Sequence, residues 1–144
     1  MPKKAKIPFK ELQELFPIVC DKLKKRYKYL RKRNEEIVDG NYIDAEYLLP
    51  LTFGEIRIII AITALVAPYM ALACTVCLSA ETHKDRRLID FIDYPDNKTT
   101  FVLKDKNKVD DFVEQIHKRI LKCAKHLKEI GEAFLKDAKK LETI

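Results

Sequence analysis

The sequence has few of the residues on which nucleotide-binding enzymes and secreted domains depend. Its 144 residues include three Gly and no Trp, and no Gly-rich loop of the kind that cradles phosphate groups. No Ser/His/Asp set stands in a recognisable context, and no carboxylate cluster suggests a two-metal site. The first residues lack the apolar segment of a secretory signal, and the four Cys residues do not suggest a disulfide framework. We therefore expect a protein without enzymatic activity or cofactor that works, or is assembled, inside a cell.

Positive charge is concentrated at one end of the chain. Residues 1–37 carry 12 Lys or Arg against 5 Asp or Glu, whereas residues 38–144 carry 16 against 17. Eight of the basic residues fall within the twelve positions from Lys22 to Arg33. Like charges three and four residues apart repel each other on a helix, so this segment is expected to meet a polyanion. Nucleic acid and an anionic membrane surface are the two candidates.

Residues 1–37 are predicted to form a basic helical arm. Apolar residues recur at three- and four-residue spacing, which is typical of a helix, and Pro17 predicts a kink or a break. Beyond Pro17 the helix is expected to reach residue 37, with basic side chains on most faces, so it is either a solvated amphipathic helix or a phosphate-binding one. We favour phosphate contacts that do not read bases. The predicted DNA-binding residues are Lys3, Lys4, Lys6, Lys10, Lys22, Lys24, Lys25, Arg26, Lys28, Arg31, Lys32 and Arg33.

Residues 38–144 are predicted to form a helical body whose first element is an apolar helix over residues 52–82. Thr52 and Glu55 have the pattern of a capping box at its start. Residues 58–80 carry no charge and are numerous enough to cross a bilayer. A single-span membrane protein with a basic cytoplasmic arm is therefore one alternative. We favour a helix buried on all sides in a bundle or a subunit interface, which indicates a multi-subunit assembly.

The rest of the body is predicted to be a β-hairpin followed by a long helix. Residues rich in Ile, Phe, Tyr, Thr and Val flank a turn at Pro95, which predicts strands over residues 87–94 and 99–104. The helix is expected over residues 107–142, capped by Asn107. Its apolar residues repeat in a heptad-like seam, which is typical of packing on another helix. The seam consists of Val109, Val113, Ile116, Ile120, Cys123, Leu127, Ile130 and Phe134.

Two weak patterns on the predicted helices have a chemical interpretation. A zinc site could be built from Cys74 and Cys77 with Cys123 and His126, although each of these residues also suits an apolar helix face. Arg119 and His126 resemble the Arg–His element of the HEPN ribonucleases, but Ile120 replaces the polar residue that follows the Arg in that family. We expect no metal and no catalytic residues.

The predicted hairpin is similar to the core hairpin of PD-(D/E)xK nucleases, including the CRISPR-associated ones. Asp90 matches the metal-binding Asp of the first strand, and Lys104 matches the Lys of the second. Val102 stands in place of the second carboxylate, and a valine side chain offers no oxygen to a hard cation. Cys20 resembles the first cluster Cys of the CRISPR-associated branch, whose remaining cysteines are missing. The resemblance therefore implies an inactive relative, and an active nuclease of either family remains an alternative.

The expected mainly α fold, with a kinked basic arm, two long helices and one hairpin between them, resembles the coat proteins of filamentous double-stranded DNA viruses of hyperthermophilic archaea. The tristromaviruses of Thermoproteus and Pyrobaculum hosts are the most similar group. The resemblance implies a nucleocapsid protein of the virion, assembled in the host cytoplasm, that wraps linear double-stranded DNA with its arm. It implies as partners copies of the same chain, a second coat protein, and a viral envelope outside the assembly.

Overall fold

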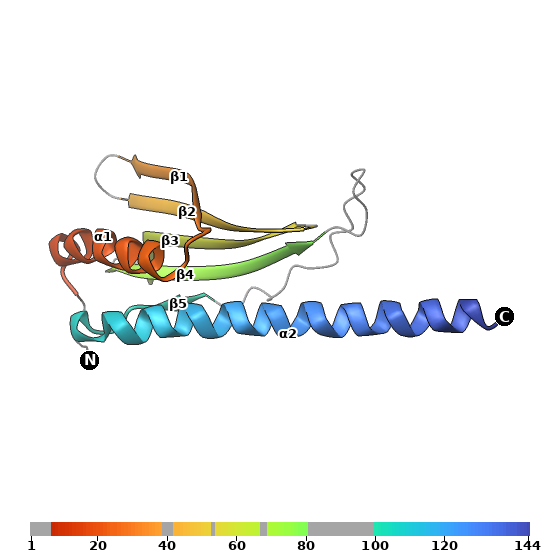
Figure 1. Cartoon of the computed structure of the whole chain (residues 1–144). Helices are drawn as coiled ribbons and strands as arrows, with labels where there is room; N and C mark the ends of the chain where they lie inside the picture. Colours follow the sequence, from red (N-terminus) through yellow and green to blue (C-terminus); the bar gives the residue numbers. More distant parts are fainter. Residues whose placement is uncertain (1–6, 39–41, 53, 67–68, 81–99) are drawn as a thin grey trace.

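The computed structural model describes residues 7–38, 42–52, 54–66, 69–80 and 100–144. In chain order the elements are α1 (Phe9–Arg26), β1 (Arg31–Val38), β2 (Tyr42–Leu51), β3 (Gly54–Val66), β4 (Tyr69–Ala80), β5 (Phe101–Val102), a short 3-10 helix (Lys106–Lys108) and α2 (Val109–Glu142). The five strands form one antiparallel sheet in sequence order, and both helices pack against it (Figure 1). The protein therefore has an α+β fold.

Alternating burial gives the sheet two different faces. In β3, Ile58, Ile60 and Ile62 are fully buried, whereas Ile59 between them is partly exposed. This is the two-residue period of a strand, in which successive side chains point to opposite faces. Ile60 pairs with Ala45 of β2 and with Cys74 of β4, both of which are also buried. The buried face therefore extends across the three central strands.

Both helices contribute to the core on this buried face. The buried helical side chains are Leu12, Phe16, Val19, Cys20 and Leu23 from α1 and Val109, Phe112, Val113, Ile116 and Cys123 from α2. The Tyr47 hydroxyl of β2 hydrogen-bonds the Cys20 thiol, and the ring of Phe112 lies 5.2 Å from that of Phe101 of β5. Burial of each large apolar side chain contributes about 1.5–3 kcal/mol. The predicted boundary after residue 37 falls within β1, and α1 shares one core with the residues that follow it.

The prediction of a mainly α fold is wrong, and the largest error concerns the apolar helix over residues 52–82. This segment forms most of β3 and β4, which pair from Gly54 with Ala80 to Val66 with Tyr69. The uncharged run is rich in Ile, Val and Thr, whose branched Cβ favours strands. A strand with few polar residues on either face has a continuous apolar sequence without a clear two-residue alternation. The spacing of its apolar residues therefore does not distinguish it from a buried helix.

The basic arm is also different from the one expected. α1 is a single helix through Pro17, and it ends at Arg26, where the predicted helix continued to residue 37. Residues Arg31–Val38 instead form β1, the edge strand that pairs with β2. Charged side chains on an edge strand are typical, since they discourage pairing with other chains. The charge density that was assigned to one helix is therefore divided between a helix and a strand.

The two C-terminal predictions have different outcomes. The first predicted strand of the hairpin, residues 87–94, lies outside the described residues. The second predicted strand is present as β5, which pairs with β4 in the described structure. The long helix is confirmed, since α2 ends at Glu142 and begins two residues after the predicted start. Asn107 does not cap it; the backbone N–H of Asn107 donates to Asp105 Oδ1 at 2.9 Å. Figure 1 shows that α2 continues well past the end of the sheet.

Candidate nucleic-acid interface

The last turns of α1 are fixed beside the first turns of α2 by three side-chain contacts. Lys22 Nζ lies 3.0 Å from Asp110 Oδ1, the Arg26 guanidinium pairs with the Glu114 carboxylate, and the Tyr27 hydroxyl lies 2.7 Å from His117 Nδ1. The first two contacts advance by four residues on both helices, so the helices run parallel. The C-terminus of α1 therefore lies beside the first turns of α2, as Figure 1 also shows.

These contacts shift the ionisation of the groups that make them. The hydrogen bond from Arg26 lowers the pKa of Glu114, and the same contact raises the pKa of Arg26. Partial burial raises the pKa of the Tyr27 hydroxyl. At neutral pH the contact surface therefore holds an ionised carboxylate against a guanidinium, and both charges are used within the chain.

The predicted DNA-binding residues are distributed over several elements. Lys3, Lys4 and Lys6 lie outside the described residues, and Lys28 lies in the connection after α1. The α1 members are Lys10, Lys22, Lys24, Lys25 and Arg26, and the β1 members are Arg31, Lys32 and Arg33. The sequence prediction of a kinked basic helical arm over residues 1–37 therefore does not describe their arrangement.

About half of the described members form ion pairs within the chain. Besides the two pairs with α2, Lys25 lies 3.2 Å from Asp21, Lys32 lies 2.7 Å from Glu35, and Arg33 lies 3.6 Å from Glu46. Four members form no ion pair with any described residue, namely Lys10, Lys24, Lys28 and Arg31. Three of these four lie around the C-terminal end of α1, so that is where unpaired positive charge gathers.

The middle of α2 adds cations that the sequence reasoning missed. Residues 115–128 contain five Lys or Arg and no Asp or Glu. Lys118, Lys122 and Lys125 are exposed there, and none of them forms an ion pair with a described residue. Lys118 follows directly on His117, which contacts the end of α1. The sequence shows that this stretch has no acidic residues. The prediction missed it because charge was counted over residues 38–144 together, where Lys and Arg nearly balance Asp and Glu.

The contact between Tyr27 and His117 joins the two stretches of chain that carry these cations, and Lys28 and Lys118 each directly follow one of its residues. We call the five cations of these two stretches the basic surface; its members are Lys24, Lys28, Lys118, Lys122 and Lys125. Beside Lys28 lies Tyr29, whose ring is 80% exposed. Lysine side chains bind phosphate as mobile point charges, and an exposed aromatic ring stacks on a base that is unpaired. The basic surface is therefore suited to a polyanion with a repeating charge.

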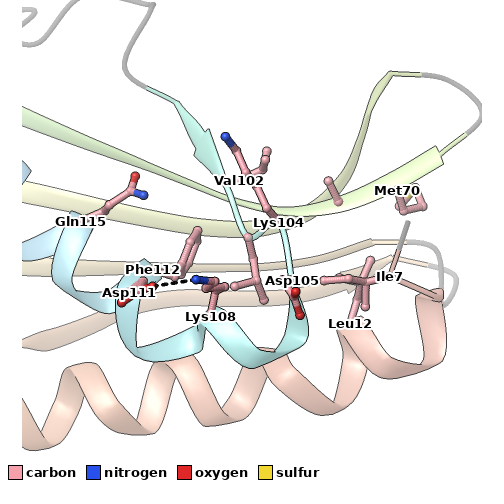
Figure 2. A pocket seen from close by; sticks show the side chains of 12 residues that line it. Ile7, Leu12, Met70, Val102, Lys104, Asp105, Lys108, Asp111, Phe112 and Gln115 are labelled. Carbon is pink, nitrogen blue, oxygen red and sulfur yellow. Dashed lines mark ion pairs between the residues drawn. The ribbon is translucent and has the colours of Figure 1, made fainter. Parts of the chain in front are cut away.

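A separate hollow lies near the start of both helices. Figure 2 shows its apolar side chains, which include Ile7, Leu12, Met70 and Phe112, together with charged ones. Of the two cations that line the hollow, Lys108 has its Nζ 3.7 Å from Asp111 Oδ2, whereas Lys104 points away from Asp111 (Figure 2). The mixture of charges and the apolar floor do not resemble a phosphate site.

The residues considered for catalysis or metal binding have other roles in the described structure. The Arg119 guanidinium lies over the Phe101 ring at 5.1 Å, and His126 lies on the part of α2 that leaves the sheet. Cys20, Cys74 and Cys123 are buried thiols. Among the described residues no group of three His, Cys, Asp or Glu side chains could hold a metal ion. Asp90, the candidate metal ligand of the nuclease hairpin, lies outside the described residues.

The membrane alternative rested on a helix over residues 58–80. These residues lie in β3 and β4 in the structure. Neither described helix combines the length and the apolar character that a membrane crossing requires. The helical span that motivated this alternative is therefore not formed.

Comparisons with known proteins give no further guide to the site. No protein-family model, no characterised protein and no solved structure matches this chain at a significant level.

Proposed function

We propose that this protein binds duplex DNA through its phosphate groups, without reading sequence, as a structural component of a nucleoprotein assembly. The observation that carries the proposal is the contact between the end of α1 and α2, which joins the two stretches of chain that carry the unpaired lysines of the basic surface. A chain whose acidic and basic residues were evenly paired would leave no such cluster.

The arrangement of acidic residues supports this proposal. Asp110 and Glu114 neutralise Lys22 and Arg26 where the helices touch. Beyond this contact the carboxylates of α2 cease until Glu129, so the cations on α2 keep their charge for an external partner. Binding of lysines to phosphates releases condensed counterions, which makes the affinity sensitive to salt. A duplex offers such phosphates at regular intervals, and its binding needs no pocket.

The virion role expected from the sequence is kept as part of this proposal. A coat protein of a filamentous virus needs sequence-independent phosphate contacts and contacts between copies. The duplex would lie against the end of α1 and the middle of α2, and it would not be wrapped by a long helical arm. Residues 1–6, which include Lys3, Lys4 and Lys6, carry further positive charge.

The test is a titration of a fluorescently labelled duplex by the full chain over a range of salt concentrations. If the five lysines of the basic surface each contact one phosphate, the logarithm of the affinity falls against the logarithm of the salt concentration with a slope of about −4.5. Lys118→Gln/Lys122→Gln is expected to reduce the steepness of this slope by about 1.8 and to weaken binding of unrelated duplexes to the same extent.

A matched control is available outside the basic surface. Lys104→Gln/Lys106→Gln removes the same charge from two exposed positions that precede α2. This control is expected to retain nearly all of the affinity and the slope. Equal losses in the two double variants would show that only net charge matters and would refute the site. Stronger binding of single-stranded than of duplex DNA would refute the duplex as the partner and would implicate Tyr29.

A further inference from the structure

The C-terminal part of α2 extends beyond the rest of the described molecule and presents an apolar stripe to solvent. We call residues 127–144 the tail. Leu127 and Ile130 are partly buried, and every residue from 131 onward is exposed. Phe134 is 53% exposed and Leu141 is 68% exposed. Beyond Ile130 all residues of the helix are exposed and give it little tertiary support, so a partner would add to its stability.

The apolar stripe of the tail continues the seam that packs the first half of α2 into the core. Val109, Val113, Ile116 and Cys123 occupy this seam where the helix lies on the sheet, and all four are buried. In the tail the seam positions are Leu127, Ile130, Phe134, Leu141 and Ile144, with Asp137 as the exception. The same heptad spacing therefore serves an intramolecular contact first and an unoccupied surface second.

Small residues border the seam of the tail. Gly131, Ala133 and Ala138 lie next to the large apolar side chains in the heptad. Glycine inside a helix costs about 1 kcal/mol relative to alanine, and a Cβ added at Gly131 would meet nothing within 4 Å in this chain. The chain's own packing therefore does not require Gly131, whereas the close approach of a second helix benefits from it.

The charges of the tail indicate which partner fits. Residues 127–135 contain one Lys and two Glu, and residues 136–144 contain three Lys, one Asp and one Glu. The first half is therefore net negative and the second half net positive. A second tail in antiparallel orientation brings each half opposite the half of opposite sign, whereas a parallel tail places like against like and Asp137 against Asp137.

We propose that the tail pairs with the tail of a second copy of this chain in an antiparallel two-helix contact. In the register that overlaps both tails completely, Leu127 faces Ile144 of the second copy, and Ile130 faces Leu141. Phe134 faces Asp137 at the centre, where Gly131 and Ala138 of the two copies border the same layer. Each tail thus covers the apolar stripe that the other leaves open.

This pairing has a consequence for the proposed DNA binding. Lys122 of the two copies would be separated by 27 residues of helix rise, or about 40 Å along the paired helices. The dimer would present two basic surfaces with a spacing slightly above one turn of B-form DNA, which is about 34–36 Å. Two linked sites bind a long duplex more tightly than one. The dimer itself does not depend on DNA, so it is tested in the absence of nucleic acid.

The test compares the mass of the full chain in solution with that of two leucine variants. Leu141 lies on the seam and Leu135 lies off it, and they are 68% and 64% exposed. The wild-type chain is expected to approach twice 16.8 kDa as its concentration rises. Leu141→Glu is expected to remain monomeric, and Leu135→Glu is expected to dimerise as the wild type does. Because both side chains are exposed in the monomer, neither change should unfold the body, and thermal melting verifies this.

Disulfide formation tests the orientation. A mixture of Ile130→Cys and Leu141→Cys chains is expected to form a disulfide-linked dimer that neither variant forms alone. Efficient linkage of Leu141→Cys chains to one another would indicate a parallel pair and would overturn the proposed orientation. A monomeric mass for the wild type up to about 100 μM, or equal effects of the two glutamate variants, would overturn the pairing itself. A monomer that still binds DNA through the basic surface would leave the proposed function standing.

Discussion

The hydroxyl oxygen of Tyr27 lies 2.7 Å from Nδ1 of His117, and the two rings stack with centroids 5.9 Å apart and planes 21° from parallel. This contact joins the end of α1 to the first turns of α2, next to the two stretches of chain that carry the basic surface. Tyr27→Phe keeps the stacked ring and removes the hydrogen bond. We expect a loss of about 0.5–1.5 kcal/mol in the free energy of unfolding, measured by urea denaturation. Tyr29→Phe is the control, because the Tyr29 ring is 80% exposed; an equal loss in both variants would contradict the role of this contact.

The alternation of burial along β3 predicts opposite outcomes for two adjacent isoleucines. Ile58 is fully buried against the helices, whereas Ile59 is partly exposed on the other face. Ile58→Ala should cost about 2–5 kcal/mol, because it leaves a cavity. Ile59→Ala should cost clearly less, and the two urea midpoints measure the difference. Similar losses in the free energy of unfolding for the two variants would contradict a β3 strand that has one buried and one partly exposed face.

Arg26 controls the ionisation of Glu114. Its hydrogen bond holds the pKa of that carboxyl below the ordinary value of 4.5. A carboxyl whose pKa is lower in the folded than in the unfolded chain stabilises the fold at any pH above its unfolded pKa. This contribution is lost as the pH falls through the pKa of the folded state. In Arg26→Gln we expect the Glu114 pKa to rise toward 4.5, which carboxyl NMR titration measures. Lys25→Gln is the matched control, since Lys25 pairs with Asp21 on α1; an unchanged Glu114 titration in Arg26→Gln would refute the contact.

Burial of Cys123 predicts a loss of stability at alkaline pH. Burial raises the pKa of this thiol from 9.0 to about 11. A thiol whose pKa is higher in the folded than in the unfolded chain contributes its full stability at any pH below its unfolded pKa of 9.0. This contribution disappears as the pH rises through the folded pKa of about 11. The wild type should therefore lose more stability between pH 8 and pH 11 than Cys123→Ala does, as measured by urea denaturation at several pH values. Parallel losses in the two proteins would show that Cys123 does not contribute.

The two helices illustrate how far local pattern determines this protein. The three- and four-residue spacing of Leu12, Phe16, Val19 and Leu23 predicted α1, and the seam from Val109 onward predicted α2 to its last residue. Both predictions succeeded because a helix that buries one face leaves a periodic record in its own sequence. The end of α1 was not predicted, since Tyr27 and Leu30 continue the same spacing after the helix has stopped.

The sheet could not be recognised in the same way. β3 and β4 bury one face on the helices and place mostly small or uncharged residues on the other, so the two-residue alternation that marks a strand is faint. The branched side chains and Pro68 were better guides than the hydrophobicity of the run. β1 was hidden by its charge, because an edge strand needs no apolar face to be part of a sheet.

The sequence by itself determined the two helices, the positive charge of the N-terminal residues and the apolar stripe that runs along α2. Only the tertiary structure decided which cations remain unpaired and which lie together. The pairing of Arg26 with Glu114 and the contact of Tyr27 with His117 join residues about 90 positions apart. The physical reason is that an electrostatic site depends on distances in space, whereas composition and periodicity record only distances along the chain.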